Sequence, residues 1–144
     1  MKVRNLMIAL VLAFVPLVAS AQFSDLDTAM SNLKRGFGSG DPQAVVAGLA
    51  AGDQVLLQFP GLMPESGAFG RDRASIALDS LFNKVKPSGF EQTSARRDSS
   101  KGQYEIAGTW AINENGTPSK RTLYITMRNN HDKWSIVSIR SAGQ

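Results

Sequence analysis

The chain has 144 residues, a formal net charge of +4 and no cysteine, which excludes disulfides, thiolate metal sites and cysteine nucleophiles. Its length suits one globular domain that buries a core without covalent cross-links. Basic residues gather in the second half, but acids and strand-forming residues are interspersed among them. We therefore expect a solvated sheet face there, and no nucleic-acid partner.

Residues 1–21 have the pattern of an export signal. Two basic residues precede an apolar run, and an Ala-Ser-Ala sequence that ends at Ala21 has the small residues of a signal-peptidase site. The apolar run of about 13 residues is shorter than the roughly 20 that span a bilayer. We expect cleavage near Ala21, a periplasmic or secreted protein with no stable membrane insertion afterwards, and a single domain over residues 22–144.

The mature part begins with a predicted helix. Ser24 and the two aspartates that follow it suit a helix N-terminus, because a hydroxyl accepts from an orphan amide and acids favour the positive end of the dipole. Apolar residues then recur at spacings of four, three and four: Leu26, Met30, Leu33 and Phe37. These spacings place them on one helix face, which we expect to be part of the core.

The stretch GFGSGDP, residues 36–42, suggests either a phosphate-binding loop or a junction between two helices. A phosphate loop follows a strand, whereas a predicted helix comes first here and the acidic Asp41 stands where an anion would bind. The pattern therefore favours a junction. We expect the glycines to end the first helix, and Asp41 to cap a second one that runs roughly from Pro42 to Ala51.

A strand and a third helix follow. The run QVLLQF, residues 54–59, fits a buried strand, and we expect residues 62–70, LMPESGAFG, to form a loop. The next segment is amphipathic, with charged residues outside. Its predicted inner face consists of Ala74, Leu78, Leu81, Phe82 and Val85. Residues 86–89, KPSG, close this helix.

The remainder, residues 90–141, predicts antiparallel strands. The even-numbered residues from Tyr104 to Ile112 share one side of a strand. Residues 113–120, NENGTPSK, predict a turn, and three alternating apolar residues then face one way: Leu123, Ile125 and Met127. A turn at residues 129–132 precedes a last strand from Trp134 to Ile139. Helices followed by strands predict an α+β domain in which one curved sheet wraps the helices.

Three stretches resemble the nuclear transport factor 2-like superfamily, which also includes ketosteroid isomerase and scytalone dehydratase: GSGDPQAVVAGLAAGDQVLLQFPG, GAFGRDRASIALDSLF and KWSIVSIRS. The first has the Gly-Asp junction before a helix and a strand, the second the Gly-Arg start of the third helix, and the last ends the final hairpin. The resemblance implies a cone-shaped fold, with three N-terminal helices packed on the concave face of a curved, mainly antiparallel sheet. With its export signal, the chain looks like a small exported bacterial family of unknown function.

The enzymes of this superfamily imply where catalytic groups should lie. In the isomerase, a carboxylate base stands near the end of the first strand, with a tyrosine and an aspartic acid as hydrogen-bond donors. Here Gln58 and Phe59 occupy the place of the base, and Leu33 that of the tyrosine. The second acid would fall near Leu123 to Ile125, where Tyr124 is expected to point away. We therefore predict no catalytic residue.

Dehydratase-like, metal and cofactor chemistry find no better candidates. The sole histidine, His131, lies in a predicted turn, where a solvated imidazole is the ordinary interpretation. Asp53 follows a glycine and is read as a turn or strand-start residue. The spacing of histidines and acids suggests no metal site, and we expect no cofactor.

The resemblance also implies a pocket between the helices and the concave face of the sheet. Its expected lining is apolar and aromatic: Leu33, Phe37, Phe59, Tyr104, Trp110, Met127 and Ile139. The small size of the chain favours the interpretation that these residues fill a core. The alternative is a cavity for a small apolar ligand, with Tyr104 or Trp110 as a polar handle.

Three functions remain open. The leading interpretation is a noncatalytic exported domain that binds a protein partner, or a second copy in a homodimer, through its sheet. The outward residues of that interface would include Thr109, Thr122, Thr126 and Arg128. The second is a carrier of a small apolar ligand in the cone, and the third, which the missing carboxylates disfavour, is an isomerase or dehydratase.

Overall fold

The computed structural model describes residues 26–49, 52–131 and 133–142. The predicted export segment, its cleavage position and the helix start at Ser24 lie outside these residues. The described chain folds into three helices and six strands, in the order α1 (Leu26–Ser39), α2 (Pro42–Val46), β1 (Gln54–Gln58), β2 (Gly67–Gly70), α3 (Arg71–Val85), β3 (Gly89–Asp98), β4 (Gln103–Glu114), β5 (Thr117–Asn130) and β6 (Lys133–Ser141). Of the described helices, none is long and apolar enough to cross a membrane.

Helix α1 buries the predicted apolar stripe but continues further than expected. Leu33 and Phe37 are fully buried. The prediction that the glycines at 36–40 end this helix is wrong for all but the last, because α1 runs to Ser39 and Gly40 then leaves it with φ 73°. Gly36 has a packing role instead, since a Cβ atom there would lie 2.5 Å from a methyl group of Val45. A glycine at this position therefore lets α2 approach α1 closely.

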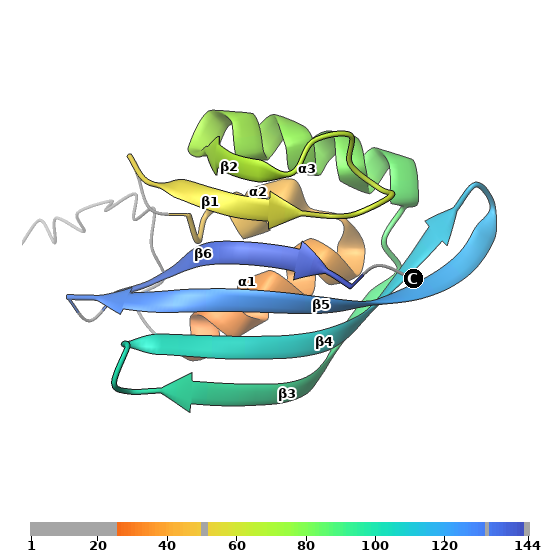
Figure 1. The fold of residues 1–144 in the computed structure, drawn as a ribbon. Helices are drawn as coiled ribbons and strands as arrows, with labels where there is room; N and C mark the ends of the chain where they lie inside the picture. Colours follow the sequence, from red (N-terminus) through yellow and green to blue (C-terminus); the bar gives the residue numbers. More distant parts are fainter. Residues whose placement is uncertain (1–25, 50–51, 132, 143–144) are drawn as a thin grey trace, which may run out of the picture.

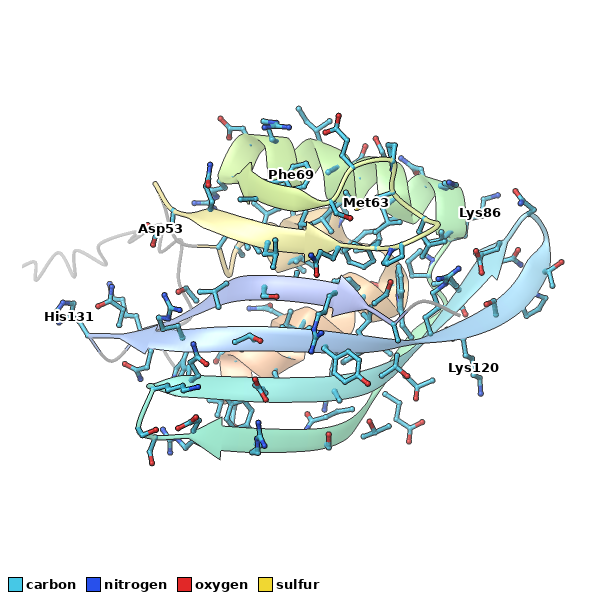
Figure 2. The ribbon with its side chains drawn as sticks, in the orientation of Figure 1. Asp53, Met63, Phe69, Lys86, Lys120 and His131 are labelled. Carbon is cyan, nitrogen blue, oxygen red and sulfur yellow. The ribbon has the colours of Figure 1, made fainter. Side chains whose placement is uncertain are left out.

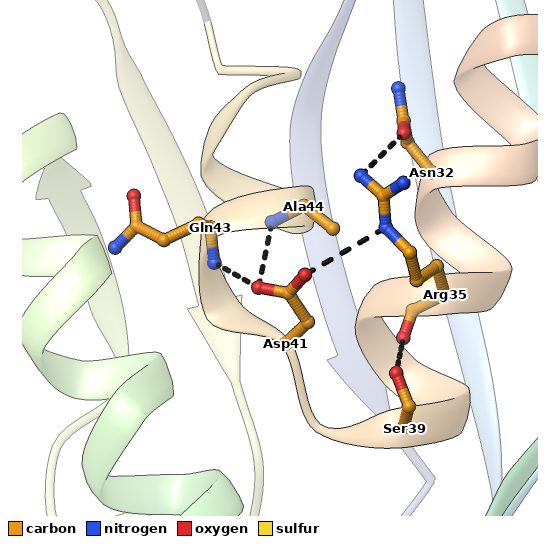
Figure 3. A network of polar contacts seen from close by, with 6 residues as sticks. All are labelled: Asn32, Arg35, Ser39, Asp41, Gln43 and Ala44. Atoms are coloured by element: carbon orange, nitrogen blue, oxygen red, sulfur yellow. Dashed lines mark hydrogen bonds and ion pairs between the residues drawn. The ribbon is translucent and has the colours of Figure 1, made fainter.

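Helix α2 starts as predicted and ends early. The Asp41 carboxylate accepts hydrogen bonds from the amides of Gln43 and Ala44, at 3.1 and 3.4 Å, and Pro42 occupies the first turn (Figure 3). The expected end near Ala51 is wrong, because the helix stops at Val46. The Gly48 carbonyl accepts from the amide of a β6 residue at 2.8 Å, so the chain leaves the helix to meet the sheet.

The six strands form one mixed sheet in the order β2-β1-β6-β5-β4-β3. Neighbouring strands are antiparallel except β1 and β6, which are parallel. Strand β2 lies within residues 62–70, where a loop was expected. It forms because Phe69 lies opposite Val55 and both side chains are buried, which extends the core under the edge of the sheet.

The β4–β5 hairpin is longer and its turn tighter than residues 113–120 predicted. Asn115 and Gly116 alone connect the strands, with φ values of 52° and 82°, the left-handed pair that suits a two-residue hairpin. Pro118 lies inside β5, where a break was expected. It is tolerated because β6 reaches only to Ser141, opposite Leu123, so no described strand needs an amide donor from the proline.

The helices cover one face of the curved sheet (Figure 1). Helix α1 packs on β3 and β4, and α3 packs on β1, β2 and β4. The predicted alternation is confirmed, because Trp110 and its even-numbered neighbours on β4 and the three apolar residues of β5 face the helices and are buried. The predicted inner face of α3 is buried as well. The α+β class with helices on a curved, mainly antiparallel sheet is therefore confirmed.

Candidate functional site

The residues predicted to line the cone lie in or beside the hydrophobic core. All are fully buried except Tyr104, which is half-buried at its edge, and they come from α1, the end of β1, β4, β5 and β6: Leu33, Phe37, Phe59, Tyr104, Trp110, Met127 and Ile139. None of them lines the two hollows described below. Their role in binding a ligand stays a prediction.

Trp110 is the centre of an aromatic cluster. The rings of Phe37, Phe59 and Phe82 meet its indole edge-on, with centroid distances of 5.6, 5.9 and 6.2 Å. Its Nε1–H donates to the carbonyl oxygen of Phe37 at 2.8 Å, in the last turn of α1, where carbonyls lack helical donors. The polar group of Trp110 therefore already serves to fix α1 on β4.

Tyr104 lies apart from that cluster. It is six positions from Trp110 on the same strand, which corresponds to about 20 Å. It stands opposite Met127, and its ring centroid is 6.1 Å from that of Trp134. The predicted lining residues thus form two groups at different heights of the sheet.

The positions where the enzymes of the superfamily imply catalytic groups, and the two other candidates Asp53 and His131, place no ionisable catalytic group in the described core. Phe59 is buried, and Tyr124 points to the outer face as expected, with the Arg140 guanidinium 4.9 Å from its ring centroid. Asp53 and His131 are exposed at the ends of strands (Figure 2). In residues 26–49, 52–131 and 133–142, no three histidines or acids gather as a metal site would require.

One carboxyl group has a shifted pKa. The hydroxyl of Ser100 donates to Asp98 Oδ1 at 2.6 Å and lowers the pKa of this carboxyl, and the neighbouring Lys101 adds to the effect. Ser100 and Lys101 belong to the exposed turn that follows Asp98, the last residue of β3. The shift therefore reflects local turn geometry at the surface, away from the core.

Arg121 is a nearly buried charge that sequence reasoning missed. Its side chain is 9% exposed, and its Nη atoms donate to Glu114 Oε1 at 3.1 Å and to the Pro60 carbonyl at 3.3 Å. Its Nε is buried without a hydrogen-bond partner. The alternation of β5 could have revealed this residue, because it places position 121 on the same side as Leu123. Arg121 ties the base of the β4–β5 hairpin to the β1–β2 connection.

The outer face of the sheet carries the first hollow, of about 360 Å³, over β3–β6. It is lined by Ser94, Arg96, Glu105, Ile106, Ala107, Tyr124, Thr126 and Arg140, which we call the outer patch. Thr109 and Thr122, expected at an interface, lie opposite each other on β4 and β5 and continue this face. Arg128 is exposed further along β5.

The second hollow lies between α3 and the β1–β2 connection and measures about 240 Å³. We call it the α3 hollow. Figure 2 shows Met63 and Phe69 beside α3. Its lining consists of Leu62, Met63, Pro64, Glu65, Phe69, Ala77, Ser80, Leu81 and Lys84. The prediction of a plain loop missed it, although the apolar residues of LMPESGAFG were a signal that this segment packs on something.

Comparison with known proteins finds likeness in structure. No family model and no curated protein matches the chain. A DUF4783 family protein from Bacteroides fragilis aligns at 21% identity and a TM-score of 0.64, over 78% of this chain and 96% of that one. One from Bacteroides uniformis aligns at 17% and 0.65, over 79% and 95%. A hypothetical protein from Catenulispora acidiphila with a ketosteroid isomerase-like fold, in complex with trimethylamine, aligns at 14% and 0.62, over 83% and 88%.

These likenesses concern the fold. They confirm the predicted nuclear transport factor 2-like architecture, with its curved open sheet and covering helices. DUF4783 proteins are themselves of unknown function, and at such identities no activity or ligand of a neighbour transfers to this chain.

Proposed function

We propose that this chain, with its nuclear transport factor 2-like fold, is a noncatalytic exported domain that pairs with a second copy of itself through the outer face of its sheet. The observation that carries the proposal is the outer patch. It combines a partly exposed aromatic side chain, small side chains and charges of both signs on one sheet face.

The centre of this face suits close packing against another sheet. Ala107, Thr109, Thr122 and Thr126 are half-buried already in the isolated chain, so their short side chains leave a low surface. Tyr124 stands among them with 40% of its surface exposed. Sheets that pack face to face lie about 10 Å apart, and an aromatic group at the centre is a common anchor of protein interfaces.

The charges around the centre favour a like partner. Glu105 pairs with Arg96 at 2.9 Å on one flank, and Arg140 lies over the tyrosine ring on the other. A two-fold contact brings the same patch of both copies together. Because Glu105 lies on one flank and Arg140 on the other, a two-fold contact can bring Glu105 of one copy near Arg140 of the other, which favours association.

The core supports a noncatalytic role. Every aspartate and glutamate in the described ranges is exposed or half-buried, and the sole histidine is exposed. The buried polar residues there are two serines, Ser135 and Ser141. A general base must lie within hydrogen-bond reach of the reacting group, and the buried residues in the described ranges include no acid and no histidine. These observations favour a binding role over isomerase or dehydratase chemistry.

The test is the oligomeric state of the purified protein by sedimentation equilibrium. We expect a dimer for the unaltered chain. Thr126→Arg should raise the dimer dissociation constant at least about tenfold, a change of about 1.4 kcal/mol, because the symmetry of the interface places two new like charges close together. Thr117→Arg, the same exchange at an exposed position beside the hairpin turn, is the matched control and should leave the dimer intact.

Two results would contradict the proposal. One is a monomer at every concentration of the unaltered protein, and the other is equal behaviour of the two arginine variants. Circular dichroism spectra should show the same fold for all three proteins, so that a loss of pairing is not confused with unfolding.

A further inference from the structure

We propose that the α3 hollow binds a medium-chain alkyl carboxylate, with the hydrocarbon in the hollow and the carboxylate at Lys84 and Lys86. The site is separate from the outer patch and from the cone residues, because it shares no lining residue with either. This proposal can therefore be tested independently of the proposed pairing.

The hollow offers an apolar wall of suitable size. Leu62, Phe69 and Leu81 are buried beneath it, while Met63 and Ala77 are half-buried at its surface. Its volume of about 240 Å³ is larger than the roughly 150 Å³ of an engineered apolar cavity that holds benzene. A short hydrocarbon chain therefore fits, and the burial of its methylene groups favours binding.

Lys84 supplies a positioned cation at the edge of this wall. Its ammonium donates to the Leu62 carbonyl at 3.2 Å, which holds it beside the hollow with donors to spare. The ion pairs found among the described residues join other side chains, so within that part of the chain Lys84 has no carboxylate partner. A ligand carboxylate would supply one.

A second, more polar hollow lies on the other side of Lys84. Lys84 also lines an adjoining hollow of about 300 Å³ with Lys86, Asn113, Asn115 and Gly116. Lys86 follows the end of α3, near the base of the β4–β5 hairpin (Figure 2). Lys84 thus stands where an apolar hollow meets a polar one that carries a second cation, the arrangement that an amphiphile with an anionic head requires.

Other charges nearby decide the orientation of the ligand. The carbonyl end of α3 disfavours an anion, and the ammonium groups of Lys84 and Lys86 offset this effect. Glu114, beside Lys84, is already paired with Arg121. Glu65 lines the α3 hollow as well and forms an exposed pair with Arg73, so a carboxylate is favoured at the lysines and disfavoured beside Glu65.

The test follows backbone amide chemical shifts of the ¹⁵N-labelled protein during titration with sodium octanoate. Octanol has the same chain without the charge, and acetate has the charge without the chain. We expect saturable octanoate shifts at residues 62, 63, 65 and 77–84, at least about threefold weaker octanol binding, and no saturation with acetate. The weakest binding that the proposal predicts is a millimolar affinity, which corresponds to about 4 kcal/mol. The absence of a saturable octanoate shift up to about 10 mM would therefore overturn the proposal.

Two variants separate the chain from the charge. Ala77→Trp should fill the hollow and abolish binding of octanoate and octanol. Lys84→Gln keeps the wall, and should weaken octanoate at least about threefold while leaving octanol unchanged. Lys101→Gln, on the exposed β3–β4 turn, is the matched control and should bind like the unaltered protein. Equal octanoate affinity in Lys84→Gln and in the control would contradict the proposal even if Ala77→Trp fails to fold.

Discussion

At the scale of single residues, Trp110 joins the helices to the sheet by two different means. Its ring meets three phenylalanine rings, and its N–H satisfies a carbonyl of α1 that lies 73 positions away in sequence. Gly108, two residues earlier, makes room for a further ring of this layer, since a Cβ atom there would lie 2.4 Å from Phe90, whose ring contacts Phe37. The aromatic layer therefore depends on one large residue and one absent side chain.

Replacing Trp110 by Phe should lower the free energy of unfolding by about 2–4 kcal/mol. The change leaves the Phe37 carbonyl without its buried donor, which costs about 1–3 kcal/mol, and removes ring volume from the core. Urea denaturation followed by circular dichroism measures this. Phe59→Leu is the comparison, because it also shrinks a fully buried ring but removes no hydrogen-bonding side chain. It should lower the free energy of unfolding by less. An equal loss in both variants would show that the hydrogen bond contributes little.

At the scale of elements, the α1–α2 junction shows how a few local interactions turn the chain. Figure 3 shows the Asp41 carboxylate bound to two amides of α2 and paired with Arg35, which is held in turn by Asn32 at 3.1 Å. The amide of Asp41 itself donates to the Gly36 carbonyl at 3.0 Å. Asp41 thus ends one helix with its main chain and begins the next with its side chain, which leaves the junction no free place for an external anion.

The cap and the ion pair of Asp41 should contribute unequally. Asp41→Ala removes both, and we expect a loss of about 1 kcal/mol, with a range of about 0.5–2 for such caps. Arg35→Gln keeps the cap and removes the ion pair together with the exposed hydrogen bond to Asn32. The paired atoms are 3.7 Å apart and their side chains are 62% and 42% exposed, so the loss should stay below about 0.5 kcal/mol. Thermal unfolding of both variants measures the difference. Equal losses would mean that the pair, and not the cap, stabilises the junction.

At the scale of the whole molecule, the sequence of residues 1–21 has export features and precedes the residues that carry the described fold. The oxidising environment outside the cytoplasm suits a chain that has no thiol to protect. We therefore propose that the protein acts after export, without residues 1–21.

Removal of this segment can be measured directly. Intact mass analysis of the protein recovered from its producing cells should show a chain that starts at Gln22. Ala21→Arg should block processing, because the peptidase requires a small residue at that position, whereas Ala21→Ser should be processed normally. Recovery of the unaltered protein with residues 1–21 still attached would contradict the prediction.

The sequence predicted the helices, the buried sides of β4 and β5 and the fold class, because periodicity reports directly which side chains are buried. It failed where distant partners decide the local structure. Helix α2 ends early because a β6 amide takes the Gly48 carbonyl. Strand β2 exists because Phe69 finds Val55 across the sheet. Pro118 fits inside β5 because β6 ends before reaching it.

The candidate sites also include features that the sequence predicted and features that it did not. The lining residues of the cone were predicted as apolar and buried, and all but Tyr104 are. The separation of Tyr104 from Trp110 could have been predicted as well, because six positions along one strand already correspond to about 20 Å. The α3 hollow brings residues 62–65 against residues 77–84, a contact that no spacing in the sequence encodes. Arg121 shows that alternation must also be read for charged residues.

The overhanging part of the β4–β5 hairpin has a further consequence. Beyond Thr122, whose carbonyl accepts from Ala142 at 2.9 Å, β5 has no second strand neighbour among the described residues. A bare strand margin of this kind is a template on which other chains can stack into fibres. Pro118 removes an amide from that margin, and Lys120 brings a charge that stacked copies would have to bury side by side. The chain can therefore extend a long hairpin into solvent while resisting growth of fibres from it.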